Sequence, residues 1–220
     1  MTCPLFVELC AGTAAVSLRL HGGPHARPPV SRMGAKTGYA HAILHALGLR
    51  QGQGHVDGTR YLLCEPDPGV RLLLHAYTDR ELAQAAAAII RSWKDEDPRA
   101  LWERLRAEGL AVCPDVGMDA REVARWLTVQ GWAYSGTGLL DPAKCGIGNV
   151  DSKGRKWGVS DQSWISGRLD TSPTIPATIR TDARTIEPAR LPPGTVAYMD
   201  PEYQGTTSSR GNRCLYPVVP

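Results

Sequence analysis

A short apolar stretch near the end of the chain, Thr195 to Met199, is followed at once by Asp200-Pro201, and Tyr203 stands shortly after. Apolar and β-branched residues favour a buried β-strand, and the Asp-Pro pair favours a turn that ends it. In open α/β sheets, ligands bind in the crevice beyond the carboxyl ends of the strands. The pattern therefore predicts an acid that accepts hydrogen bonds from an amino group, and a ring that stacks on a planar substrate.

A second strand followed by a tight turn is predicted at the amino-terminal end. Leu5 to Cys10 has the composition of a strand, and the small residues that follow predict a turn into a helix from Ala14 to Leu20. Small residues at such a turn let backbone N–H groups approach a ligand closely. A further strand is predicted at Tyr61 to Cys64, and Glu65 follows it directly. Strands that alternate with helices in this way indicate an α/β fold.

Helices are predicted between the strands from capping residues and hydrophobic periodicity. Acidic or hydroxyl residues mark their amino ends, and glycine marks carboxyl ends. The predicted features are a helix from Tyr39 to Leu47 ended by Gly48, a loop from Gln51 to Asp57, a helix from Val70, capping boxes at Thr78–Glu81 and Asp119–Glu122, and a helix begun by Asp97-Pro98 and ended by Gly109.

Taken together, these segments resemble motifs of the Dam-like DNA adenine-N6 methyltransferases. The catalytic tetrad of that family is Asp-Pro-Pro-Tyr, and the chain has Asp200-Pro201-Glu202-Tyr203. The family's cofactor turn is Glu-Pro-Phe-x-Gly-x-Gly, and the chain has ELCAGTA here. The resemblance implies a Rossmann-like methyltransferase sheet that binds S-adenosylmethionine. It assigns catalysis to Asp200, Pro201 and Tyr203, and cofactor binding to Glu8, Cys10 and Gly12.

Three other segments are similar to cofactor-binding parts of the family. Arg32 to Lys36 resembles a Gly-Gly-Lys segment, which precedes the glycine-rich turn in the family and follows it here. Glu65 stands where an acid holds the ribose hydroxyls, with Asp67 as the competing acid, and Asp182 stands where an acid lies near the cofactor adenine. The ordinary alternatives are solvated cations for Arg32 and Lys36, a proline-rich turn for Glu65, and a surface acid beside Arg180 and Arg184 for Asp182.

The resemblance implies a chemistry for the tetrad. The target adenine leaves the base stack, and its N6 donates hydrogen bonds to the Asp200 carboxylate and the Pro201 carbonyl while Tyr203 stacks on the ring. The ordinary alternative is an Asp-Pro turn that merely caps a strand. Glu202 replaces the family's second proline, and its charge either favours a cationic cofactor, repels phosphate, or marks an impaired member. Cytosine-N4 enzymes more often have Ser in place of Asp200, so adenine is favoured.

Residues 1–76 and 176–220 are predicted to form the cofactor-binding and catalytic domain, and 77–175 an inserted target-recognition region. Basic and tryptophan residues alternate in the second half of this insertion. Lys153, Arg155 and Lys156 are predicted to contact phosphates of double-stranded DNA, and the alternative is a small tryptophan core with a charged rim. The resemblance also implies further sheet strands beyond Tyr203, so we expect an incomplete sheet or a fragment.

The composition sets limits on the remaining possibilities. The 220 residues are enough for one α/β domain with an insertion, and a net charge of +3 gives no overall basic field. The six cysteines include no Cys-x-x-Cys pair, and the histidines show no metal-binding constellation. With no signal peptide or membrane-spanning stretch, we expect a soluble, cytoplasmic protein. The predicted function is methyl transfer from S-adenosylmethionine to adenine N6 in DNA, and the alternatives are cytosine-N4 methylation and a non-catalytic DNA- or cofactor-binding relative.

Overall fold

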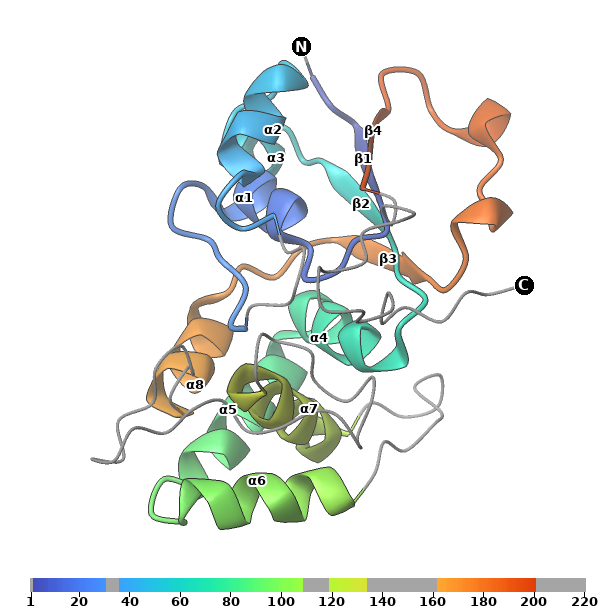
Figure 1. Ribbon diagram of the computed structural model, residues 1–220. Helices are drawn as coiled ribbons and strands as arrows, with labels where there is room; N and C mark the ends of the chain where they lie inside the picture. Colours follow the sequence, from blue (N-terminus) through green and yellow to red (C-terminus); the bar gives the residue numbers. More distant parts are fainter. Residues whose placement is uncertain (1, 31–35, 109–118, 134–161, 201–220) are drawn as a thin grey trace, which may run out of the picture.

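The computed structural model of the protein describes residues 2–30, 36–108, 119–133 and 162–200. Within these ranges, helices and strands alternate at the start of the chain, a run of helices follows, and two strands end the order (Figure 1). The elements are β1 (Leu5–Leu9), α1 (Ala15–Gly22), α2 (Ala40–Ala46), α3 (Gln53–Val56), β2 (Arg60–Cys64), α4 (Pro68–Thr78), α5 (Arg80–Ser92), α6 (Pro98–Ala107), α7 (Ala120–Trp132), α8 (Gln162–Thr171), β3 (Ala177–Arg180) and β4 (Val196–Met199).

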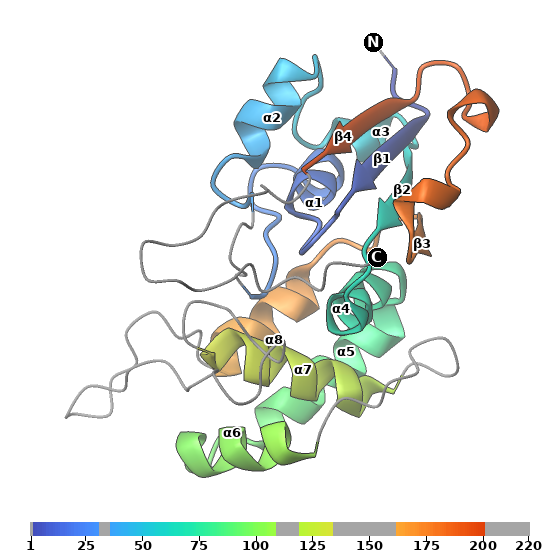
Figure 2. The ribbon, with the colours of Figure 1, turned by 45° about the vertical axis from the view of Figure 1, so that its right-hand side comes forward.

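The four strands form one parallel sheet in the order β3-β2-β1-β4. The chain moves outward from β1 to β2 and β3, and then returns to place β4 on the other side of β1. This reversal between β1 and β4 is the topological switch point of Rossmann-like sheets, where ligands bind beyond the carboxyl ends. In Figure 2 the strand arrows point toward the part of the molecule that contains α4 to α8. The predicted α/β class is confirmed, with a strand order consistent with a Rossmann-like fold.

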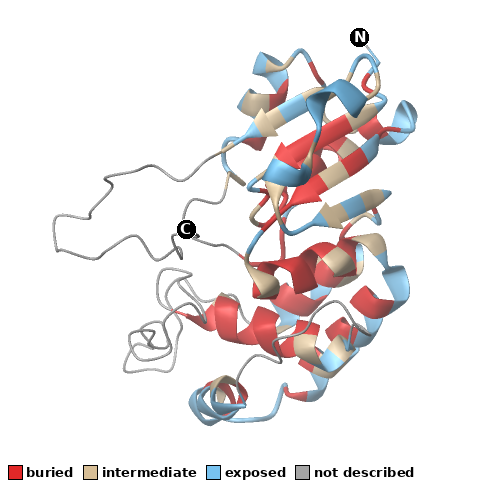
Figure 3. Cartoon of the chain, turned by 90° about the vertical axis from the view of Figure 1, so that its right-hand side faces the viewer, coloured by how far each residue is buried: buried red, intermediate tan, exposed pale blue. Residues whose placement is uncertain are grey.

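The two inner strands carry the core of the sheet, whereas the two outer strands are half exposed (Figure 3). Phe6, Tyr61 and Leu63 are fully buried on the face that the helices cover. The outer strands β3 and β4 alternate between intermediate and exposed residues, and Met199 is 61% exposed. The prediction that Thr195 to Met199 is a buried strand is therefore wrong. It is an edge strand, since β1 is the strand paired with it among the described residues.

Helices α4 to α8 fill the interval between β2 and β3 and share one hydrophobic core with the sheet. The predicted start of α6 is confirmed, because Asp97 Oδ1 accepts the Ala100 N–H at 2.8 Å. Asp119 likewise caps α7. Four tryptophans are buried in this core: Trp93, Trp102, Trp126 and Trp132. Of the tryptophans in the basic segment 153–168, Trp164 is half exposed and Trp157 lies outside the described residues.

Two local predictions fail. Gln51 to Asp57 is not only a loop, because α3 forms within it and the Gln53 side chain donates to Asp57 Oδ2 at 2.8 Å. The cap of α5 is Asp79 rather than Thr78, since Asp79 Oδ1 accepts the N–H groups of the first turn. A carboxylate placed directly before the helix is a better acceptor here than Thr78, whose hydroxyl donates to the His75 carbonyl. Among the described residues, no helix is both long and apolar enough to cross a membrane.

Candidate cofactor and catalytic site

Four of the predicted site residues, a glycine and three acids, lie where the four parallel strands end, at one edge of the sheet. Gly12 is in the turn after β1, Glu65 directly follows β2, Asp182 comes shortly after β3, and Asp200 directly follows β4. Because all four strands run parallel, their carboxyl ends meet at the same edge. Residues that are far apart in the sequence therefore share one side of the molecule.

The turn after β1 has an unusual backbone. Cys10, Gly12 and Ala14 all have positive φ values, of 56°, 51° and 50°. Glycine adopts this left-handed conformation without penalty, whereas Cys10 and Ala14 each bear a cost of roughly 1–2 kcal/mol. The Ala11 N–H donates to the Cys64 carbonyl at 2.8 Å and thereby fastens the turn to the end of β2. Cys10 itself is exposed, at the position where the family has an aromatic residue.

Glu65 connects this turn to the end of β2. Its Oε2 accepts the Gly12 N–H at 2.7 Å, and its Oε1 accepts the Asp67 N–H at 3.0 Å. Buried Arg71 holds the same segment from behind by donating to the Glu65 and Pro66 carbonyls. These contacts fix the Glu65 carboxylate beside the glycine turn, at the carboxyl end of β2.

Asp67, the competing acid, has a different position. Its Oδ1 accepts the Gly69 N–H at 2.8 Å and the Val70 N–H at 3.2 Å, which makes it the N-cap of α4. The predicted helix from Val70 thus begins slightly earlier, at Pro68. Of the two acids, Glu65 contacts the glycine turn and Asp67 supports a helix.

Glu8 lies beneath the turn, with only 3% of its surface exposed. Its Oε2 accepts the Ser17 N–H at 3.0 Å and a hydrogen bond from the Ser17 hydroxyl. Burial raises the pKa of Glu8 to about 7, against the opposing effect of the Ser17 hydrogen bonds, and the charge of Asp200 adds to the increase. Helix α1 has no side-chain cap at its N-cap residue, so Glu8 provides acceptors to its first turn. Sequence reasoning missed Ser17, although an acid inside an apolar strand must find donors nearby.

Lys36 and Asp200 form an ion pair at this edge, with Lys36 Nζ 2.8 Å from Asp200 Oδ2. The side chains are 24% and 18% exposed, so the pair is largely shielded from solvent. The structure therefore brings a predicted cofactor residue into direct contact with the predicted catalytic acid. The contact favours a site role for Lys36 over that of a solvated loop cation.

Two buried hydroxyls lie next to these residues in the sequence. Thr13 follows Gly12, Thr37 follows Lys36, and the Oγ1 atom of each has no hydrogen-bond partner among the described residues. A buried hydroxyl without a partner costs about 1–3 kcal/mol. Unpaired hydroxyls beside the turn and beside Lys36 fit a ligand with polar groups, as S-adenosylmethionine has.

Asp182 is at the same edge but has partners of its own. Its carboxylate accepts the Arg184 N–H at 2.8 Å and pairs with the Arg184 guanidinium, whose Nε lies 3.0 Å away. The hydrogen bonds from Arg184 hold the pKa of Asp182 below its usual range. This position agrees with the alternative of a surface acid beside an arginine.

The remaining predicted site residues lie outside the described part of the chain: Arg32, Pro201, Tyr203, Lys153, Arg155 and Lys156.

Within the described ranges, no group of three or more His, Cys, Asp and Glu side chains is arranged to hold a metal ion. The comparisons with known proteins add no assignment, since neither a protein family nor a curated protein matches the chain.

Proposed function

We propose that the protein is a cytoplasmic methyltransferase that transfers a methyl group from S-adenosylmethionine to adenine N6 in double-stranded DNA. The observation that carries the proposal is the contact between Lys36 and Asp200 at the carboxyl ends of the strands. This contact joins two segments that resemble separate methyltransferase motifs. The strand order adds support, because it places the glycine turn and Glu65 at the same edge.

The cofactor would be held at the turn after β1. Glu65 is suited to accept the ribose hydroxyls, because its carboxylate is at the carboxyl end of β2 and its Oε2 lies 2.7 Å from the N–H of Gly12 in the turn. The left-handed turn and the unpaired Thr13 hydroxyl offer polar groups beside it. Glu8 acts from below by fixing the start of α1 through Ser17. S-Adenosylmethionine supplies an electrophilic methyl group, and Asp182 would serve its adenine only by exchanging its contacts with Arg184.

Asp200 is the residue that orients the amino group of the target base. Lys36 is bound to its Oδ2, which leaves Oδ1 to accept a hydrogen bond from N6. A fixed carboxylate keeps the nitrogen lone pair in one direction, so that positioning and electrostatics contribute most of the rate enhancement. In this proposal Pro201 contributes its carbonyl and Tyr203 stacks on the base, as in the family that the tetrad resembles.

The DNA duplex would be bound mainly by the inserted region, residues 77–175. Lys153, Arg155 and Lys156 are the proposed phosphate contacts there. Among the described residues of this region, Arg168 stacks on the half-exposed Trp164, with its guanidinium carbon 3.9 Å from the ring centroid. Trp164 is exposed and Arg168 is partly buried, and an arginine–aromatic pair of this kind at the surface suits contact with nucleic acid.

One observation favours a second candidate, a relative that binds the cofactor without transferring methyl groups. In the ion pair, the Lys36 ammonium neutralises the Asp200 carboxylate, and Glu202 replaces the family's proline directly after the turn. A neutralised carboxylate stabilises less of the positive charge that develops on the target nitrogen.

The two candidates differ in one assay. The full chain is incubated with tritiated S-adenosylmethionine and unmethylated DNA, and the nucleosides are separated after digestion. N6-Methyladenine as the labelled product supports the proposal, and N4-methylcytosine would assign the cytosine-N4 activity instead. Cofactor binding by calorimetry without any labelled nucleoside would identify the non-catalytic relative.

A further inference from the structure

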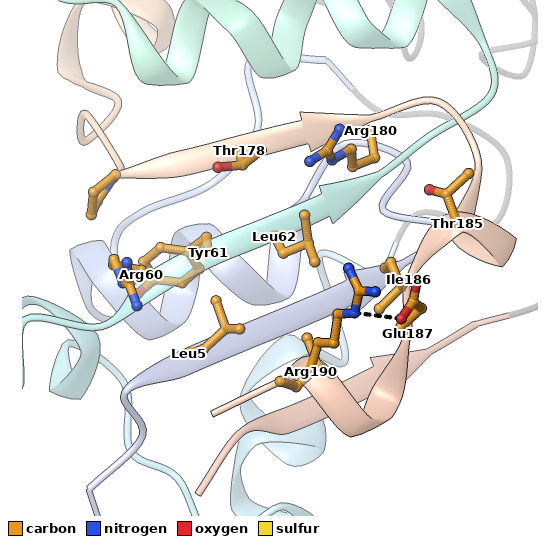
Figure 4. A pocket seen from close by; sticks show the side chains of 12 residues that line it. Leu5, Arg60, Tyr61, Leu62, Thr178, Arg180, Thr185, Ile186, Glu187 and Arg190 are labelled. Atoms are coloured by element: carbon orange, nitrogen blue, oxygen red, sulfur yellow. Dashed lines mark ion pairs between the residues drawn. The ribbon is translucent and has the colours of Figure 1, made fainter. Parts of the chain in front are cut away.

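A cavity of about 410 Å³ lies on the side of the sheet away from the helices (Figure 4). The connection from β3 to β4, residues 181–195, crosses this face. It contains only two 3-10 turns, Ala183–Thr185 and Pro188–Arg190, where crossovers between parallel strands usually carry an α-helix. The short turns leave space between the connection and the strands, and the volume is within the range of small-molecule sites.

The floor and one wall of this cavity are apolar. Leu5 and Leu62 face it from the two central strands, opposite to the buried face of Phe6 and Leu63. Ile186 and Leu191 line it from the crossing connection. An apolar lining with a few polar groups around it is typical of a ligand-binding site.

The charged groups around the cavity are mostly positive. Arg60, Arg180 and Arg190 line it together with a single carboxylate, Glu187. Arg190 is paired with Glu187, with 2.6 Å between Nε and Oε2, and Figure 4 marks this contact. Arg60 and Arg180 form no ion pair with any described residue. Within the described part of the chain, these two guanidinium groups therefore line the cavity without a carboxylate that neutralises them.

These two arginines lie at opposite ends of the cavity (Figure 4). Arg60 begins β2 in register with Leu5, and Arg180 ends β3 in register with Cys64 at the other end of β2. A rise of about 3.3 Å per residue separates the two backbone positions by roughly 13 Å along the strand direction. Figure 4 shows the two side chains at opposite ends of the cavity, so a molecule with an anionic group at each end matches their placement better than a single small anion does.

We propose that this cavity binds an elongated small molecule with two anionic ends and an apolar middle. The ends are carboxylates or phosphates, which guanidinium groups bind through paired hydrogen bonds. The middle lies on Leu5 and Leu62. The site is on the face of the sheet and does not depend on the proposed methyl-transfer site at the strand ends.

Calorimetry on the full chain tests the proposal with octanedioate as the dicarboxylate and hexane-1,6-diyl bisphosphate as the bisphosphate. Octanoate has the same chain length as octanedioate with one anionic end. We expect at least one of the dianions to bind tenfold or more tightly than octanoate, and the better of the two identifies the anionic group.

Arg60→Gln and Arg180→Gln should each reduce dianion affinity to about that of octanoate. Arg99→Gln is the matched control, because Arg99 is an exposed arginine on α6 that pairs with Glu103 far from the cavity. Circular dichroism checks that the substitutions of these exposed arginines leave the fold intact. Equal affinity for octanoate and both dianions, absence of dianion binding at millimolar concentration, or unchanged binding in both arginine variants would overturn the proposal.

Discussion

Lys36 Nζ lies 2.8 Å from Asp200 Oδ2, although the two residues come from opposite ends of the chain. The pair joins the segment before α2 to the end of β4, directly beside the glycine turn. Burial is the main cause of the raised pKa of Glu8, and the Ser17 hydrogen bonds oppose it. The charge of Asp200 adds to the increase. The strand ends thus form an electrostatically coupled site rather than a set of independent surface charges.

The ion pair should be measurable as a coupling free energy. In a double-mutant cycle with Lys36→Met and Asp200→Asn, we expect the free energies of unfolding to deviate from additivity by about 0.5–1 kcal/mol. Urea denaturation of the four proteins measures it. Lys94→Met is the control, since Lys94 is exposed at the end of α5 and should show no coupling to Asp200. Strict additivity for the Lys36 pair would mean that the two side chains do not interact in solution.

Glu8 should make stability depend on pH. The pKa of Glu8 is about 7 in the folded protein and about 4.3 in the unfolded chain. Its contribution to the free energy of unfolding is therefore complete below the unfolded pKa and is lost as the pH rises through 7. Glu8→Gln stays neutral, and its advantage over the wild type should grow on the order of 2–3 kcal/mol between about pH 4 and pH 8. Denaturation at a series of pH values measures this, with exposed Glu103→Gln as control. A pH-independent difference would contradict the buried, protonated state.

The two acids after β2 should respond differently to substitution. Glu65→Ala removes the acceptor beside Gly12, so the affinity for S-adenosylmethionine should fall by about tenfold or more, the equivalent of a lost charge-assisted hydrogen bond. Asp67→Asn, in the N-cap of α4, should keep the affinity close to that of the wild type. Calorimetry compares the two variants. The reverse pattern would transfer the ribose role to Asp67.

Replacing Cys10 in the left-handed turn by glycine should stabilise the folded protein. Cys10 is exposed with φ at 56°, so Cys10→Gly should raise the free energy of unfolding by about 0.5–1 kcal/mol, less than the full left-handed penalty because glycine also gains freedom in the unfolded chain. Cys10→Ala keeps a Cβ atom and should bring no such gain. Thermal unfolding separates the two variants, and equal stability of both would show that the turn is unstrained.

Sequence reasoning located the strand ends well, because strand composition and turn residues are local signals. β1, β2 and β4 were all predicted as strands, and the parallel pairing of β1 with β2 then brings Gly12 and Glu65 together. The burial of β4 was predicted wrongly, since an apolar composition does not show whether a strand has neighbours on both sides. The cap at Asp79 was missed because two adjacent residues, Thr78 and Asp79, both satisfy the local rule.

The contacts of the site could not be predicted from local patterns. The pairing of Lys36 with Asp200 depends on the order of strands in the sheet, which brings distant segments together. The hydrogen bond from Ser17 to Glu8 was not predicted either, because it joins the strand β1 to the helix α1 across the turn. The assignment of Asp67 to a helix cap required the geometry of α4.

We propose that Asp200 orients the amino group of adenine for methyl transfer. The most direct test compares tritiated-methyl transfer onto unmethylated DNA by the wild type and by Asp200→Ala, with calorimetry of S-adenosylmethionine for both proteins. We predict N6-methyladenine from the wild type, and a nearly complete loss of product with largely unchanged cofactor affinity from the variant, because the carboxylate acts on the target nitrogen. Transfer by Asp200→Ala at the wild-type rate would contradict the assignment of this site.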